Sequence, residues 1–197
     1  MRIIAGEFRG RRLAAPKGEG TRPTTDRVRE ALMSVLASAR GGLDGAVVLD
    51  AFAGSGALGL EALSRGAAAA VFCERDGAAL RTLRANVEAV GLAAPRARVV
   101  RTDVLEHPPA APGAPFDLVF LDPPYALGAM EALGVPAALA ARGALSVDAL
   151  VVYEHVAASC GAADEAAAAR GLSLAQRKKY GDTVVDVLRP AAPDAAE

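Results

Sequence analysis

The hydrophobic positions of this chain fall into two patterns that alternate along its length. Short apolar runs, typical of strands buried on both faces of a parallel sheet, predict strands at residues 47–50, 70–74, 97–102, 116–121, 149–154, 172–179 and 183–188. Apolar residues at helical spacing predict helices at 26–39, 57–63, 77–90, 127–142 and 162–170, the fourth interrupted near 134–136. This alternation predicts a doubly wound α/β fold with a mostly parallel, seven-stranded sheet.

Both ends of the chain depart from this alternation. The last two strands flank Gly181, which can supply the positive φ of a hairpin turn, so we expect the last strand to be antiparallel. Near the amino terminus, β-forming residues at 2–6 and 11–13 surround a glycine-containing turn and predict a second hairpin. We therefore divide the chain into an amino-terminal arm with its hairpin (1–24), one α/β domain (25–190) and a disordered tail (191–197).

A glycine-rich loop follows the first predicted strand. Gly54, Gly56 and Gly59 satisfy the G-x-G-x-x-G spacing between a strand and a helix. The first two glycines allow a tight turn and a close approach of backbone to ligand, and the third lets the helix lie near the sheet. By itself, this spacing does not distinguish a nicotinamide cofactor from S-adenosylmethionine.

Acidic residues at the ends of the first three strands favour S-adenosylmethionine. Asp50 places an anion before the loop, where it can pair with a methionine ammonium and would repel a pyrophosphate. Glu74 can accept hydrogen bonds from two ribose hydroxyls, and Asp103 can accept one from an adenine amine. We expect this cofactor to contact Asp50, Ala51, Gly54, Ser55, Gly56, Glu74, Asp103, Val104 and Asp122.

The tetrapeptide Asp122-Pro123-Pro124-Tyr125 follows the fourth strand, at the edge where open α/β sheets bind ligands. The two prolines stiffen the turn and leave its carbonyl groups free to accept hydrogen bonds. Asp122 adds a carboxylate, and Tyr125 adds an aromatic face on which a planar ring can stack. These groups suit a planar ligand with an NH2 group, such as a nucleobase. Asp122, Pro123 and Tyr125 are therefore the candidate catalytic residues.

Four segments, taken in order, resemble those of the RsmD family of class I S-adenosylmethionine-dependent methyltransferases. They are 2–6 with 9–13, 22–32 (RPTTDRVREAL), 50–63 (DAFAGSGALGLEAL) and 122–125. The resemblance covers the chain to about residue 190, although 177–183 (RKKYGDT) matches less well. It implies a Rossmann-like fold and methylation of the N2 amine of one guanine in 16S ribosomal RNA, within the small subunit or an assembly intermediate.

Other functions remain compatible with parts of this pattern. The DPPY tetrapeptide also serves adenine-N6 methyltransferases that act on DNA or RNA, and its chemistry does not separate adenine N6 from guanine N2. A nicotinamide-dependent oxidoreductase would use the same glycines but would leave DPPY unexplained. An RNA-binding module with an inactive methyltransferase fold would leave Asp122, beside an intact glycine loop, without a role.

Charge is distributed unevenly along the chain. The net charge is −1, yet residues 1–29 hold eight basic and three acidic residues, so this segment carries +5 and the remainder −6. A basic arm on an acidic body is typical of proteins that bind a phosphate backbone. We expect the RNA to contact Arg2, Arg9, Arg11, Arg12, Arg22, Thr24, Thr25 and Arg27.

Composition bears on the number of domains, on the cellular location and on whether a disulfide or metal site is expected. The 197 residues, 52% of them hydrophobic, are enough for one core. We expect a cytoplasmic protein without a membrane partner, because the chain shows no run of eighteen apolar residues and no signal-peptide pattern. Cys73 and Cys160 are isolated, and His107 and His155 lack partners at ligand spacing, so we expect neither a disulfide nor a metal site.

Overall fold

Seven strands form one sheet in the computed structural model, which describes residues 1–15 and 26–191. They are β1 (Val47–Asp50), β2 (Ala69–Glu74), β3 (Ala97–Arg101), β4 (Phe116–Leu121), β5 (Leu145–Val156), β6 (Leu172–Tyr180) and β7 (Thr183–Pro190). Their order is β3-β2-β1-β4-β5-β7-β6, and β7 alone runs in the direction opposite to the other strands. The predicted sheet, mostly parallel with an antiparallel last strand, is confirmed.

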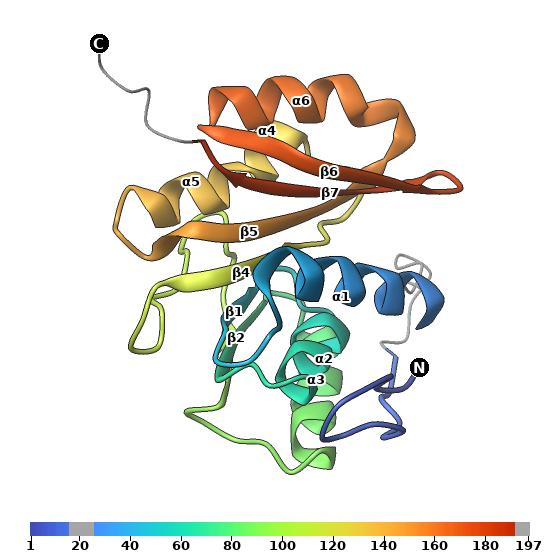
Figure 1. Ribbon diagram of the computed structural model, residues 1–197. Helices are drawn as coiled ribbons and strands as arrows, with labels where there is room; N and C mark the ends of the chain where they lie inside the picture. Colours follow the sequence, from blue (N-terminus) through green and yellow to red (C-terminus); the bar gives the residue numbers. More distant parts are fainter. Residues whose placement is uncertain (16–25, 192–197) are drawn as a thin grey trace.

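Helices cover both faces of this sheet (Figure 1). One face carries α1 (Asp26–Arg40), α2 (Ala57–Ser64) and α3 (Gly77–Ala89). The other carries α4 (Ala129–Ala132), α5 (Gly134–Ala140) and α6 (Cys160–Ala169), with the 3-10 turn η1 (Ala157–Ser159) before α6. In β4, Phe120 packs into the first layer and Val119 into the second, which explains the uninterrupted apolar run of this strand. No described helix is long and apolar enough to cross a membrane.

Two elements differ from their predicted ranges by more than two residues or by a break. The helix expected over 127–142 is two helices, α4 and α5, and the break falls beside the predicted interruption. Pro136 accounts for it, because proline has no N–H to bond the carbonyl four residues earlier. Strand β5 extends beyond the predicted 149–154 at both ends, and its last residue, Val156, pairs with Thr183. Of the predicted tail (191–197), all but Ala191 lies outside the described residues.

The amino-terminal arm forms the predicted hairpin, held by a single antiparallel bridge between Arg2 and Arg12. Backbone hydrogen bonds close it, from Ile3 N to Arg11 O (2.9 Å) and from Leu13 N to Met1 O (3.0 Å). The side chains of Ile3, Phe8 and Leu13 are buried in the same core as α1, α2 and α3. Residues 1–13 of the arm are therefore part of the folded domain.

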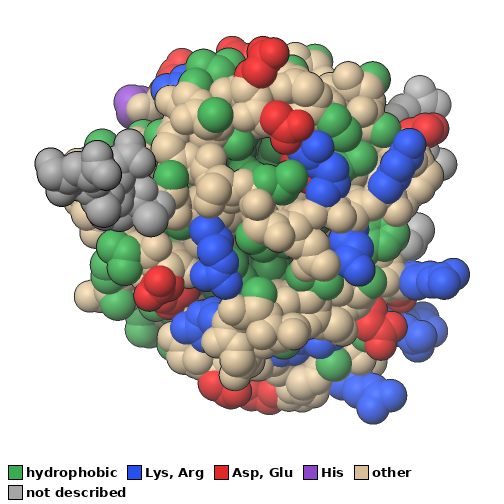
Figure 2. All heavy atoms as spheres, turned by 45° about the horizontal axis from the view of Figure 1, so that its top comes forward, with side chains coloured by type: hydrophobic (Ala, Val, Ile, Leu, Met, Phe, Trp, Pro, Cys, Tyr) green, Lys and Arg blue, Asp and Glu red, His purple; other side chains and the backbone are tan. Residues whose placement is uncertain are grey.

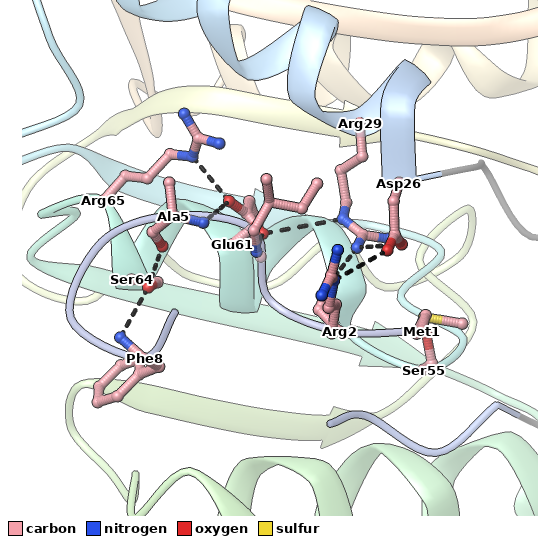
Figure 3. Close-up of polar contacts among 12 residues, drawn as sticks. Met1, Arg2, Ala5, Phe8, Asp26, Arg29, Ser55, Glu61, Ser64 and Arg65 are labelled. Carbon is pink, nitrogen blue, oxygen red and sulfur yellow. Dashed lines mark hydrogen bonds and ion pairs between the residues drawn. The ribbon is translucent and has the colours of Figure 1, made fainter. Parts of the chain in front are cut away.

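Buried polar side chains of α2 hold the arm in place (Figure 3). The fully buried carboxylate of Glu61 accepts hydrogen bonds from the backbone N–H groups of Ile4 (2.8 Å) and Ala5 (3.1 Å). Ser64 Oγ accepts from Phe8 N at 2.9 Å. Between these contacts, the backbone of Gly6 lies so close to α2 that a Cβ atom would fall 1.7 Å from the Ser64 carbonyl oxygen. Only glycine fits there.

Arg29 of α1 joins the same cluster (Figure 3). Its side chain is 1% exposed, and its guanidinium lies 3.8 Å from Glu61 and 3.0 Å from Asp26, while it also donates to the carbonyl of Arg2. Arg65 donates to the other side of the Glu61 carboxylate at 2.8 Å. One buried carboxylate on α2 thus connects the arm, the first turn of α1 and α2 itself.

Candidate active site

A cavity of about 880 Å³ opens at the carboxyl edge of the parallel strands. This volume lies within the range of small-molecule and cofactor sites. The cavity brings together eight of the residues predicted from the sequence: Ala51, Gly54, Glu74, Asp103, Val104, Asp122, Pro123 and Tyr125. They come from the end of β2 and from the loops after β1, β3 and β4, because the carboxyl ends of parallel strands meet at one edge of the sheet.

The glycine loop forms one wall of the cavity, and packing against the sheet explains the glycine at position 59. Gly54 lines the cavity. Gly59, in the first turn of α2, lies against β2, where a Cβ atom would fall 2.4 Å from the Phe72 ring. The helix can therefore approach the sheet only with glycine at this position. Ser55 and Gly56 do not line the cavity.

Asp50 lies behind the loop and does not line the cavity either. Its side chain is 2% exposed, and Oδ2 accepts a hydrogen bond from Gly59 N at 3.0 Å. Burial raises the pKa of this carboxyl group to about 7, the Gly59 hydrogen bond opposes that shift, and the negative charge of Glu74 adds to it. Asp50 thus positions the first turn of α2, one layer behind the cavity.

Glu74 connects the end of β2 to the glycine loop. Its Oε2 accepts from Gly54 N at 2.9 Å, and its Oε1 accepts from Asp76 N at 2.7 Å. A carboxylate has about four lone-pair sites, so each oxygen can accept a further hydrogen bond from a ligand. The backbone contacts therefore fix the orientation of this acceptor in the cavity wall.

Asp103 is held in the same way beyond the end of β3. Its Oδ2 accepts from Arg75 Nη1 at 2.7 Å, and its Oδ1 accepts from Leu105 N at 3.1 Å. The hydrogen bond from Arg75 holds the pKa of Asp103 below its usual range, with a smaller contribution from Leu105. Asp103 is therefore an ionised acceptor in the cavity wall.

The DPPY turn forms the opposite wall. Asp122 is partly buried, and burial raises the pKa of its carboxyl group well above the usual range. The negative charges of Glu154 and Asp50 raise that pKa further. Tyr125, in contrast, is 54% exposed at the rim of the cavity. A proton-accepting group inside the cavity and an accessible aromatic face at its rim are thus only three residues apart.

Asn86 of α3 connects the glycine loop to the amino-terminal arm. Its side chain is buried, and Nδ2 donates to the carbonyls of Ser55 (2.8 Å) and Ala14 (3.0 Å). Its Oδ1 accepts from Ala14 N at 2.8 Å. Sequence reasoning assigned no role to Asn86, because its position on α3 gives no sign of which loop it faces.

The cavity also contains residues that the sequence analysis did not select. They are Phe52, Cys73, Arg75, Asp76, Ala79, Thr102, Leu105, Pro124, Ala126, Leu127 and Glu131. Most of them directly adjoin a predicted site residue in the same loop, so the rule that ligands bind at strand ends could have included them. Glu131 is different: it comes from the short helix α4, which only the tertiary structure brings to the rim. No group of three or more metal-ligating side chains occurs among the described residues.

The predicted RNA contacts fall into three groups. Arg22, Thr24 and Thr25 lie outside the described residues. Two arginines of the arm have partners within the protein, since Arg2 lies 3.6 Å from Asp26 and Arg11 donates to Ala89 O at 3.3 Å. The side chains that are exposed and make no hydrogen bond or ion pair within the described part of the chain are Arg9, Arg12 and Arg27.

Comparisons with known proteins agree with this architecture. The family model described as "Conserved hypothetical protein 95" matches residues 1–189. Over 131 residues, the chain is 48% identical to the ribosomal RNA small subunit methyltransferase D of Escherichia coli, an alignment that covers 66% of this chain and 63% of that protein. It is 42% identical over 135 residues to the putative rRNA methyltransferase YlbH of Bacillus subtilis, which covers 68% of this chain and 71% of that one.

Solved structures extend the similarity to almost the whole chain. The putative methyltransferase yhhF of Escherichia coli has a TM-score of 0.77 and 38% identity, with 98% of this chain and 99% of that chain covered. A putative methylase of Haemophilus influenzae has a TM-score of 0.73 and 30% identity, with 97% and 98% covered.

Proposed function

The chain belongs to the family described as Conserved hypothetical protein 95, the RsmD family, and from that premise we propose that it methylates the N2 amine of a guanine in small-subunit ribosomal RNA. S-adenosylmethionine is the proposed methyl donor. Two observations support the proposal: the names of the relatives, which refer to ribosomal RNA methylation, and a cavity that combines acidic acceptors with the DPPY turn.

The chemistry of the cavity wall fits this cofactor better than a dinucleotide. Glu74, Asp76, Asp103 and Asp122 line the cavity, and Asp50 lies directly behind it. Clustered carboxylates would repel a pyrophosphate, whereas they attract a cationic ligand that carries hydroxyl and amine donors. In this arrangement Glu74 accepts hydrogen bonds from the ribose, and Asp103 accepts one from the adenine amine. The bound cofactor would supply an electrophilic methyl group.

Asp122 and Pro123 orient the amine of the target base. The lone pair of guanine N2 is delocalised into the ring, so the free amine is a weak nucleophile. Hydrogen bonds from the amine to the Asp122 carboxylate and the Pro123 carbonyl hold it in line for attack, and such positioning can lower a barrier by roughly 7–11 kcal/mol. When the nitrogen gains the methyl group, it releases a proton. The raised pKa of Asp122 suits this carboxylate to accept it.

Tyr125 provides a surface for the base. A base that reaches this cavity has left its stack, which costs a few kcal/mol and less in a loop than in a duplex. Stacking on an exposed aromatic ring returns about 1–3 kcal/mol per base. The single observation that carries the proposal is therefore the pairing of a partly buried carboxyl group, Asp122, with an exposed ring, Tyr125, at one cavity.

A methylation assay with product identification tests the proposal. The purified protein is incubated with S-adenosylmethionine and unmethylated 16S rRNA, free or assembled into small subunits, and the nucleosides are analysed by mass spectrometry. We expect N2-methylguanosine. N6-methyladenosine would assign the site to adenine instead, and the absence of any methylated nucleoside, together with stabilisation by NAD(H) alone, would overturn the proposal.

Variants of the DPPY turn assign the roles within it. Asp122→Ala should abolish turnover while the dissociation constant for S-adenosylmethionine changes only a few fold, because Asp122 faces the base. Tyr125→Ala should lower activity less severely, and Tyr125→Phe, which keeps the ring, should be nearly silent. Loss of cofactor binding with normal residual chemistry in Asp122→Ala would contradict this assignment.

A further inference from the structure

The position of β7 places the end of β6 at the same edge of the sheet as the cavity. Because β7 is antiparallel to both β5 and β6, β6 runs in the direction of β4 and β5. In the register of the sheet, Leu121 pairs with Tyr153, Glu154 with Val185, and Val185 with Lys178. Asp122 follows Leu121, so it lies three strand spacings from Lys178, or about 14 Å at roughly 4.8 Å per spacing.

The basic residues near this end of β6 have different surroundings. Arg177 makes two hydrogen bonds of 2.7 Å to the buried carboxylate of Asp186 and one of 2.7 Å to Asp164. Its charge is therefore neutralised within the protein. Lys178 and Lys179 are exposed, and neither side chain has a hydrogen-bond or ion-pair partner in residues 1–15 and 26–191.

Protection of a sheet edge does not account for these lysines. Lysine on an edge strand discourages pairing with another chain, and β6 is an edge strand. However, residues 172–176 carry no charge, and Leu174 among them is 44% exposed. Both lysines lie among the last three residues of β6, beside the turn. The basic residues of β6 thus lie at the end of the strand nearest the cavity, and residues 172–176 are uncharged.

The turn that carries these lysines is held in a fixed position. Tyr180 packs against the core on the α1 side, and Gly181 has the positive φ (64°) of a tight hairpin turn. The carbonyl of Asp182 accepts a hydrogen bond from Ala157 N at 2.8 Å, which attaches the turn to η1. The two ammonium groups therefore extend from a rigid base.

The figures show on which side of the molecule this turn and the protruding basic side chains lie. In Figure 1, the β6–β7 turn and the amino terminus both lie on the right-hand side of the molecule. Figure 2 is turned about the horizontal axis, which keeps right and left, and shows Lys and Arg side chains protruding mainly on the right and lower right, with acidic side chains between them.

We propose that the β6–β7 turn is an RNA-binding element of the proposed methyltransferase, in which Lys178 and Lys179 contact phosphates of nucleotides next to the target base. The inference rests on the proposed function, since it takes RNA as the substrate. Ammonium groups on flexible stems act as point charges that bind phosphate without demanding one geometry. Lys178, whose backbone lies about 14 Å from that of Asp122, and Lys179, which follows it on the other face of β6, can therefore contact the strand next to a base bound at Tyr125.

A charge series at the two lysines tests this element. We compare Lys178→Gln/Lys179→Gln, which removes both charges, with Lys178→Arg/Lys179→Arg, which keeps them. The probe is 16S rRNA transcribed in vitro, free and assembled into small subunits, titrated at several salt concentrations. In the glutamine variant, we expect the log–log salt slope of RNA binding to fall by about 1.4, at about 0.7 per phosphate contact on a single strand. Its KM for RNA should rise several-fold.

Three controls separate the possible outcomes. The arginine variant should match the wild type, and both variants should keep the wild-type melting temperature, dissociation constant for S-adenosylmethionine and kcat at saturating RNA. An unchanged salt slope and KM in the glutamine variant would overturn the proposal. So would a loss seen with assembled subunits and absent with free rRNA, because the lysines would then contact a ribosomal protein. If the wild type binds rRNA without methylating it, the proposed function fails, while the salt slopes still decide the role of the turn.

Discussion

The amino-terminal arm and the β6–β7 turn are both basic hairpins, yet their charges have different surroundings. In the arm, Arg2 and Arg11 have partners within the protein, and buried Glu61 and Asn86 fix the backbone. In the turn, Lys178 and Lys179 have none among the described residues. The comparison teaches that the number of basic residues in a segment does not give the number available to a partner. That depends on which charges the fold neutralises.

The arm is accordingly a structural element, and its contact with RNA stays a prediction. Its tip bonds Ser64, at the carboxyl end of α2, so it lies about 12 Å, the length of this eight-residue helix, from the glycine loop. Met1, in contrast, contacts Ser55 within that loop. Arg9, next to the tip, is therefore remote from the cavity, whereas Arg12, paired with Arg2, lies nearer to it.

Removing the arm should lower the stability of the protein, and this is the largest effect that we expect in either hairpin. Deletion of residues 1–13 exposes the surface that Ile3, Phe8 and Leu13 cover, at about 1.5–3 kcal/mol for each side chain. It also leaves Glu61 without its backbone donors. We expect a melting temperature at least 10 °C lower or no folding, since domains are stable by only about 5–15 kcal/mol. Arg9→Ala is the control and should stay within about 0.5 kcal/mol of the wild type. A truncated protein of wild-type stability would show that the arm is an appendage.

Substitution of Glu61, the buried carboxylate beneath the arm, should give the next largest loss of stability. Glu61→Gln should lower the free energy of unfolding by about 3–5 kcal/mol, because it leaves the buried guanidinium of Arg29 without this carboxylate. Urea denaturation measures the loss, with Glu30→Gln on the exposed side of α1 as control. The double variant Glu61→Gln/Arg29→Met should be more stable than Glu61→Gln alone. Simple additivity of the two substitutions would contradict a coupled pair.

Asp50 should respond to pH in a predictable direction. Its folded-state pKa, about 7, lies above the usual 3.8, so the folded protein binds this proton more tightly than the unfolded chain does. The wild type therefore loses stability at this site as pH rises from about 4 through 7. Asp50→Asn, whose amide oxygen can still accept from Gly59, should gain a few kcal/mol relative to the wild type between pH 4 and 8, at about 1.4 kcal/mol per unit of pKa shift. A stability difference independent of pH would show that the buried carboxyl group does not titrate in this range.

Substitution of the arginines of the arm that have no partner among the described residues, Arg9 and Arg12, should have the smallest effects, and these effects should be on RNA binding. Arg12→Gln should reduce the salt slope of RNA binding by about 0.7 and weaken affinity less than the double lysine variant does. Arg9→Gln should change the salt slope less, because Arg9 is remote from the cavity. Both variants should keep the wild-type melting temperature. Equal losses for Arg9 and Arg12 in the same titration would instead indicate that the RNA follows the whole length of the arm.

The sequence by itself determined the elements of the fold and eight of the residues that line the cavity. Strands buried on both faces must be apolar throughout, so continuous apolar runs in the sequence predicted β1, β2 and β4. Because carboxyl ends of parallel strands share an edge, residues after them, such as Glu74, Asp103 and Asp122, could be predicted to meet. The hairpin turn at Gly181 and the approach of Gly59 to the sheet followed from the special geometry of glycine.

Only the tertiary structure decided which charged groups face a ligand and which face the protein. Asp50 ends β1 as predicted, yet the direction of its side chain places it behind the cavity. Nothing local distinguishes Arg177 from Lys178, because the difference is made by Asp164 and Asp186, on other elements. Likewise, the insertion of β7 between β5 and β6 depends on pairing between strands distant in the chain. Local patterns specify elements and edges, whereas the partners of a charge depend on contacts that only the folded chain makes.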